Sequence, residues 1–195
     1  MARPNFLFLI TDQQRADYLG CYGHPTLKTP HIDSIAAHGT RFERFYVASP
    51  VCMPNRATLM TGRMPSVHGA RSNGLPLSLR ANTFVDALRA AGYATALVGK
   101  SHLQNFTGQP AILKRPPARP RDQVLDPSFA EAHKSPFEGA YDQEHPKHWN
   151  AGHDFSMRLP FYGFEHVDLC TAHGDQVGGQ NDRDEMENLF EDVAL

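Results

Sequence analysis

Apolar runs and helix-period stripes follow one another along the first hundred residues. Residues 5–11 form a continuous apolar run that breaks off at Asp12, which is the pattern of a parallel strand buried on both faces of a sheet. Residues 93–98 repeat this pattern, and residues 42–47 predict a further strand. Ligands of open α/β sheets collect at the carboxyl ends of strands, so the polar residues that follow these runs are the first candidates for a site.

Two segments between these runs predict helices with clear ends. Residues 29–39 begin with Thr29 as the cap and Pro30 as the first helical residue, and Gly39 ends the helix. The stripe that we expect to be buried consists of Ile32, Ile35 and Ala36. Residues 82–92 predict a second capped amphipathic helix.

A third helix is predicted to begin near Cys52. Pro54 fits its first residue, because the missing N–H would have no helical partner there, and Gly62 ends it. Cys52 then lies at or just before a helix N-terminus, where free N–H groups and the helix dipole favour anions. The alternative is that Cys52 is a small buried core residue, as free cysteines often are.

Polar residues stand at the ends of two predicted strands. The carboxylate of Asp12 suits a hard cation such as Ca²⁺ or Mg²⁺, although its position alone favours a cap of the following turn. Lys100 and His102 follow residues 93–98, and side chains two positions apart share a face of a strand. Lys100 offers a point charge to an anionic ester, and His102 can carry a proton at neutral pH.

Composition narrows the class of function. The 195 residues include 19 Lys and Arg against 21 Asp and Glu, with no basic stripe for nucleic acid and no polybasic tail for a membrane. The three cysteines are a small and odd number, which does not indicate a disulfide framework. The early apolar run is too short for a transmembrane helix and lacks the flanks of a secretory signal, so we expect a cytoplasmic protein.

Residues 108–160 differ from the rest of the chain. Prolines recur through this segment, and no apolar periodicity appears. We expect a long irregular excursion, which forms either the rim of an active site or a mobile insertion. Trp149, the single tryptophan, is predicted to pack this excursion against the body of the protein.

Several motifs in one order resemble the type I sulfatases of the alkaline-phosphatase superfamily. They include the opening at residues 3–12, Cys52-x-Pro54-x-Arg56 with Thr-Gly-Arg at residues 61–63, and Gly-Lys-x-His-Leu at residues 99–103. The resemblance implies an α/β fold in which a mixed, mostly parallel sheet is flanked by helices, with the site at strand ends and the fold incomplete at its C-terminus. It also implies metal-assisted hydrolysis of a sulfate ester.

The same resemblance implies a nucleophile made from a cysteine. In the family, the formylglycine-generating enzyme oxidises this residue to Cα-formylglycine, whose hydrated aldehyde attacks with one hydroxyl and expels the bound ester by deprotonation of the other. The resemblance gives this role to Cys52, with Arg56 orienting the diol and His102 contacting it. One divalent cation is implied at Asp12 and residue 52, and Ca²⁺ is favoured over Mg²⁺ or Mn²⁺.

Substrate binding is implied for Lys100, Asn73 and Gln13. Lys100 would bind the sulfate and stabilise charge that develops in the transition state. Asn73 either contacts the anionic oxygens of the substrate or only forms a turn with the glycine after it. Gln13 stands where many members have a second Asp, and Gln at this place occurs in the branch with phosphonate monoester hydrolases and choline-sulfatase-like enzymes. The choice between sulfate and phosphonate stays open.

The family takes further metal ligands, an Asp followed by Asn or His, from the later half of its domain, and neither pair occurs here. We therefore expect residues 1–195 to be the N-terminal part of a sulfatase catalytic domain that is inactive by itself. Three hypotheses follow: a sulfatase acting on a small anionic ester, a phosphonate or phosphodiester hydrolase with the same machinery, and an inactive remnant that folds partly and binds a partner through exposed sheet. The bare sheet edges and apolar surface of such a remnant predict aggregation or homo-oligomers.

Overall fold

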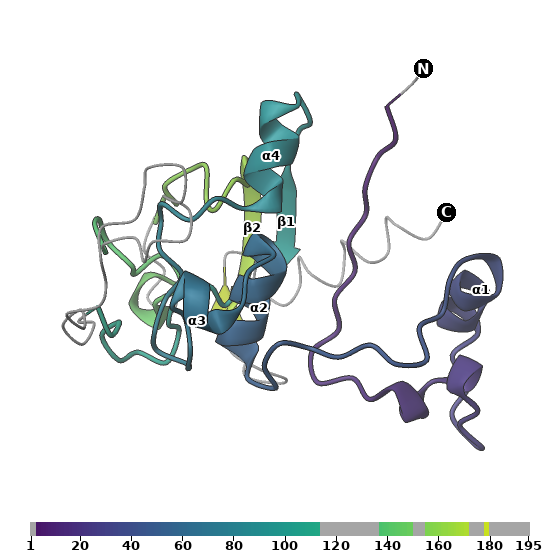
Figure 1. The fold of residues 1–195 in the computed structure, drawn as a ribbon. Coiled ribbons are helices and arrows are strands. Elements are labelled where there is room, and N and C mark those ends of the chain that lie inside the picture. The colour runs from purple at the N-terminus through teal and green to yellow at the C-terminus, as the bar shows by residue number, and fades with distance from the viewer. Residues whose placement is uncertain (1–2, 114–136, 150–154, 172–177, 180–195) are drawn as a thin grey trace. The chain divides into compact units, whose positions relative to one another are not determined.

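A computed structural model describes residues 3–113, 137–149, 155–171 and 178–179 of the chain (Figure 1). The chain divides into two compact units, Met1–Tyr46 and Val47–Leu195, and each is described by itself. The first unit contains the short 3-10 helices η1 (Ala16–Tyr18) and η2 (Gly20–Tyr22) and the helix α1 (Pro30–His38). The second unit contains all the described strands and the remaining helices.

The ends of α1 agree with the sequence prediction, but Thr29 acts differently from a simple cap. The hydroxyl of Thr29 donates to Asp33 Oδ1 at 2.8 Å and accepts from the backbone N–H of Gly20 at 2.8 Å. Asp33 also accepts from the backbone N–H of Cys21 at 2.7 Å. Thr29 and Asp33 therefore fasten η2 to the start of α1, and Gly39 follows the last helical residue as predicted.

Three predictions in the first unit are wrong. Residues 5–11 and 42–46 have no regular secondary structure, and their large apolar side chains are exposed, with Leu7 at 84% and Tyr46 at 85%. The stripe of α1 is not buried either, since Ile35 is 63% exposed. An apolar pattern shows which face a segment can bury, but burial and a strand ladder both need a neighbouring element. The described sheet is formed by strands of the second unit instead.

The helices of the second unit are α2 (Cys52–Thr61), α3 (Pro65–His68) and α4 (Phe84–Ala90). Gly62 ends α2 in the left-handed region with φ of 65°, where glycine has no steric cost. Cys52 is the first residue of α2, so Pro54 is the third helical residue and not the first. The short helix α3 follows α2 and is capped at its end by Gly69. Thr83 caps α4 through a capping box with Asp86.

The sheet is small. Strand β1 (Ala96–Gly99) pairs in parallel with β2 (His166–Thr171), and β2 pairs antiparallel with β3 (Gly178–Gly179). This mixed sheet beside helices confirms the predicted α/β class. The strand predicted at residues 93–98 begins later and is not buried on both faces, because Val98 is 57% exposed.

The hydrophobic core lies in the second unit. Its buried members come from α2, α4, β2 and the segments between them: Ala57, Met60, Ala70, Leu77, Val85, Leu103, Phe161, Tyr162, Val167 and Leu169. The hydroxyl of Tyr162 donates to the carbonyl of Leu77 at 2.7 Å, and Thr83 donates to the carbonyl of Tyr162 at 3.0 Å. The turn at residues 161–164 thus fixes the start of α4 against the core.

The described part of the predicted excursion is irregular, as expected, with one 3-10 turn, η4 (Pro146–His148). Trp149 packs against the core, which confirms its predicted role, and its indole N–H donates to the carbonyl of Gln143 at 2.9 Å. This segment is therefore attached to the same core that supports α2 and β1.

Candidate active site

Cys52 is placed at the N-terminus of α2 by the local sequence. Val51 is the extended residue before the helix, and Cys52 is half-buried at its first position. The side-chain carbonyl of Asn73 accepts from the backbone N–H of Met53 at 3.2 Å. Asn73 is therefore held beside the start of the helix, next to Cys52. The turn at residues 72–75 is also present, with Gly74 at φ of 89° and the N–H of Leu75 donating to the carbonyl of Ser72.

Arg56 connects α2 to the end of β1. Its Nη1 donates to the backbone carbonyl of Lys100 at 2.7 Å, across 44 positions of sequence. Figure 1 shows α2 beside the carboxyl end of β1. The predicted nucleophile helix and the predicted Gly-Lys-x-His-Leu segment are therefore neighbours in the fold. A charged donor makes this hydrogen bond stronger than one between neutral groups.

Lys100 and His102 meet on one aromatic ring. The ammonium nitrogen of Lys100 lies 5.4 Å from the centroid of Phe106, and the ring centroids of His102 and Phe106 are 3.8 Å apart. The argument from strand alternation does not apply to them, because β1 ends at Gly99 and His102 has a left-handed φ of 51°. Phe106, which the sequence prediction missed, brings the two side chains together.

Glu144 is a second residue that the sequence prediction missed. Its side chain is fully buried, and its two carboxylate oxygens accept from the backbone N–H groups of His102, at 2.6 Å, and Gln104. Burial raises the pKa of the Glu144 carboxyl to about 7, against the effect of these N–H donors and of Arg56. No local pattern distinguishes this glutamate from the other polar residues of the irregular segment.

Asp12 and Gln13 belong to the first unit. Both side chains are exposed, and Gln13 has a left-handed φ of 50°. The structure thus brings Cys52, Asn73, Arg56, Lys100 and His102 into one region of the second unit, whereas Asp12 and Gln13 are part of the first unit. Within the described ranges, no three His, Cys, Asp or Glu side chains come together as a cation site.

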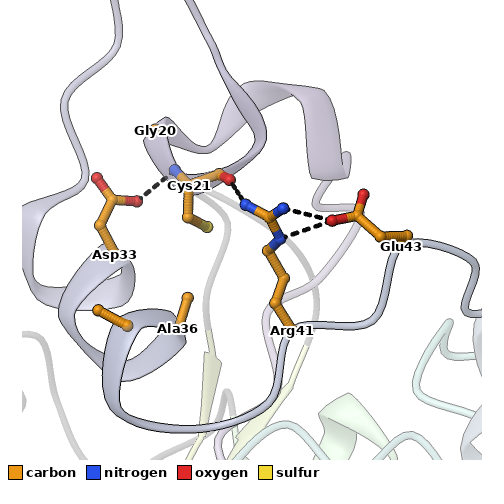
Figure 2. A pocket seen from close by; sticks show the side chains of 7 residues that line it. Gly20, Cys21, Asp33, Ala36, Arg41 and Glu43 are labelled. Atoms are coloured by element: carbon orange, nitrogen blue, oxygen red, sulfur yellow. Dashed lines mark hydrogen bonds and ion pairs between the residues drawn. The ribbon is translucent and has the colours of Figure 1, made fainter.

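The first unit has an open hollow of its own (Figure 2). The guanidinium of Arg41 lies between the carboxylate of Glu43 and the backbone carbonyl of Cys21, and it donates to both. Asp33 accepts from the backbone N–H of Cys21 on the other side. Arg41 and Glu43 are thus paired with each other, and the carboxylate of Asp33 is bound to the Cys21 N–H and the Thr29 hydroxyl.

The three cysteines are all free, and they differ in their surroundings. Desolvation and the Asp33 carboxylate raise the pKa of the Cys21 thiol. Burial raises the pKa of the Cys170 thiol, against a weaker opposing effect of Lys100. Both thiols are therefore disfavoured as anionic nucleophiles, and among the three cysteines Cys52 is the one that begins an α-helix.

No described helix is long and apolar enough to cross a membrane.

Comparison with known proteins gives one consistent result. The family model described as Sulfatase matches residues 4–161. Mouse steryl-sulfatase is 42% identical over 113 residues, which are 51% of this chain and 18% of that protein. Human arylsulfatase A is 42% identical over 108 residues, 51% of this chain and 21% of that protein. A solved sulfatase from Bacteroides fragilis, named yidJ, has 36% identity and a TM-score of 0.47 over 49% of this chain and 22% of its own. The match spans about a fifth of each relative.

Proposed function

The chain belongs to the sulfatase family, and from this premise we propose that it forms the nucleophile-bearing part of an enzyme that hydrolyses sulfate esters. The observation that carries the proposal is the hydrogen bond from Arg56 to the carbonyl of Lys100. It joins the helix that begins with Cys52 to the segment that contains Lys100 and His102. Two sequence motifs that are far apart thus form one cluster.

Residue 52 is the proposed nucleophile. As Cα-formylglycine, it would supply a hydrated aldehyde for attack on sulfur. The N-terminus of α2 favours negative charge at this position, because the first backbone N–H groups of a helix point outward and carry the positive end of the dipole. Asn73 is held at the same helix end by its bond to Met53, and its amide nitrogen carries two donor hydrogens for an ester oxygen.

Lys100 and His102 are the proposed partners of the sulfate group and of the nucleophile. Lys100 provides a positive charge, and His102 provides an imidazole that can give or take a proton. Arg56 donates a hydrogen bond from one guanidinium nitrogen to the carbonyl of Lys100, so in this structure it connects the Cys52 motif to the Gly-Lys-x-His-Leu motif. Its predicted role in orienting the diol would use its remaining donors.

The divalent cation, with Ca²⁺ favoured, remains a proposal for Asp12 and residue 52. The described residues do not bring three His, Cys, Asp or Glu side chains together as a cation site. Gln13 remains a proposed substrate contact. The formylglycine-generating enzyme is the proposed maturation partner of the chain. The cytoplasmic location predicted from the sequence also stays a prediction.

Sulfate esters are the proposed substrate class because the matched relatives are named steryl-sulfatase and arylsulfatase A. The test uses the intact protein that carries this chain, made together with a formylglycine-generating enzyme. Hydrolysis of 4-nitrophenyl sulfate should be lost in Cys52→Ala and retained in Cys21→Ala, which removes a thiol from the other unit. Unchanged turnover in Cys52→Ala would refute the proposal, and preferred hydrolysis of a matched phosphonate monoester would replace the substrate class.

A further inference from the structure

The buried carboxylate of Glu144 connects the irregular segment to the backbone that carries His102. Glu144 Oε1 accepts from the N–H of His102 at 2.6 Å, and Oε2 accepts from the N–H of Gln104. The N–H of Leu103 between them also favours the charged carboxylate. One side chain therefore takes up consecutive backbone donors across about 40 positions of sequence.

Neighbouring hydrogen bonds fasten the same short backbone segment. The N–H of Gln143 donates to the side-chain carbonyl of Gln104 at 2.9 Å. The N–H of Leu77 donates to the carbonyl of Leu103 at 2.9 Å. Residues 102–104 are thus held from two sides, and every side chain from residue 101 to residue 106 is buried.

The backbone that Glu144 holds has an unfavourable conformation. His102 has φ of 51°, a region that side chains with a Cβ rarely adopt. Such a conformation persists only when the surrounding contacts impose it, and it is common where a side chain must be aimed. The turn at His102 directs the chain so that Phe106 returns to contact both His102 and Lys100.

A purely structural role would not need a carboxylate here. Burying a charged group carries a large desolvation cost, and apolar residues often stabilise a core as well or better. The carboxyl group gives something else: two oxygens at fixed separation, directed at two backbone N–H groups. Arg56, which binds the carbonyl of Lys100, contributes a favourable charge from α2.

We propose that Glu144 is a positioning residue of the sulfatase reaction: its buried carboxylate holds the backbone of residues 102–104 so that His102 and Lys100 are presented together beside α2. This inference rests on the proposed function for the identity of the reaction. It does not rest on that function for the contact between Glu144 and His102, which can be measured separately.

The first arm of the test needs no activity. In the purified chain, NMR should show slow exchange of the His102 and Gln104 amides and ring-proton shifts of His102 caused by the Phe106 ring. Glu144→Gln offers one carbonyl oxygen and a donor in place of the second acceptor, so the His102 shift should be lost. Glu138→Gln is the matched control, because Glu138 is exposed and paired with Arg80. Fast exchange of both amides in an unaltered chain whose other core amides exchange slowly would overturn the inference without any variant.

The second arm measures catalysis in the intact protein. Glu144→Gln should lower kcat for 4-nitrophenyl sulfate by about tenfold or more with a much smaller change in KM, the pattern of an interaction that matters in the transition state. Glu144→Asp, which keeps both oxygens, should recover part of kcat. Unchanged kcat together with an unchanged His102 signal in Glu144→Gln would refute the inference. Absence of sulfatase activity in the unaltered protein would instead refute the proposed function, and the NMR arm would still decide the contact.

Discussion

The burial of Glu144 makes stability depend on pH in the direction opposite to that of most carboxylates. Burial raises the pKa of this carboxyl from 4.5 to about 7. Between these values the unfolded chain has released the proton while the folded chain still binds it. The folded state therefore binds more protons, and the free energy of unfolding falls as the pH rises through this window. The contribution is fully present below the unfolded pKa and is lost above the folded one.

The size of the effect follows from the same values. A change in pKa from 4.5 to about 7 corresponds to about 3 kcal/mol of unfolding free energy. This is a large share of the stability of an ordinary domain, which is about 5–15 kcal/mol. Glu144→Gln has no carboxyl to ionise at this position, so its free energy of unfolding should not show this decrease with rising pH.

His68 changes the pH dependence of stability in the opposite direction, so the stability of the unaltered chain alone does not isolate the effect of Glu144. Burial lowers the pKa of the His68 imidazole from 6.5 to about 4. Its Nδ1 accepts from the N–H of Ala70, which leaves Nε2 to donate to the hydroxyl of Thr58 at 3.0 Å. Its contribution is present above the unfolded pKa and is lost as the pH falls toward about 4. The contributions of His68 and Glu144 to the pH dependence of stability partly cancel. Subtracting the stability of Glu144→Gln from that of the unaltered chain removes the contribution of His68.

Urea unfolding at a series of pH values measures this difference. The fluorescence of Trp149 is a suitable signal, because it is the only tryptophan and packs against the core five positions from Glu144. The stability of the unaltered chain minus that of Glu144→Gln should fall by about 3 kcal/mol from about pH 4 to about pH 8. The same difference for Glu138→Gln should stay nearly flat. A flat difference for Glu144→Gln would show that burial does not raise the pKa of this carboxyl in the folded chain.

Three further predictions concern other contacts. Arg56→Ala should cost about 1.5–3 kcal/mol in unfolding free energy and lower kcat, because it removes a charged hydrogen bond between α2 and the carbonyl of Lys100, just after β1. An equal effect of Arg71→Ala, at an exposed position, would contradict this reason. Thr83→Ala should lower the free energy of unfolding by about 1 kcal/mol, because the capping box of α4 is lost, whereas Thr83→Ser should keep it. Equal thermal unfolding of the two variants would show that the cap does not contribute to stability. The pKa values of the Cys21 and Cys170 thiols are raised, so iodoacetamide at neutral pH should alkylate both more slowly than free cysteine. Peptide mass spectrometry measures these rates, and alkylation as fast as that of free cysteine would contradict the raised pKa values.

Helix ends were predictable because they depend on local chemistry. Pro30 and Gly39 delimit α1, and Gly62 ends α2, since each residue has a backbone preference that acts within one turn. Cys52 was therefore placed correctly at a helix N-terminus. Strands were less predictable, because residues 5–11 have the composition of a buried strand, but a ladder depends on a partner elsewhere in the chain.

In the candidate site, too, residues that belong to a local motif were predictable, and residues that depend on a distant contact were not. The sequence pattern pointed to Lys100 and His102, and the structure brings them together on Phe106. It did not point to Glu144, because a single glutamate in an irregular segment has no periodicity or motif. Its contact with His102 arises only from the tertiary fold. The predicted roles of Asp12 and Gln13 stay predictions, since both belong to the other unit.

The most direct test of the central claim is the mass of the peptide that contains residue 52. The intact protein would be made with a formylglycine-generating enzyme, digested and measured beside its Cys52→Ser variant. The account predicts a peptide in which one oxygen replaces sulfur and two hydrogens, in a protein that hydrolyses a sulfate ester. An unmodified Cys52 in a fully active sulfatase would contradict it.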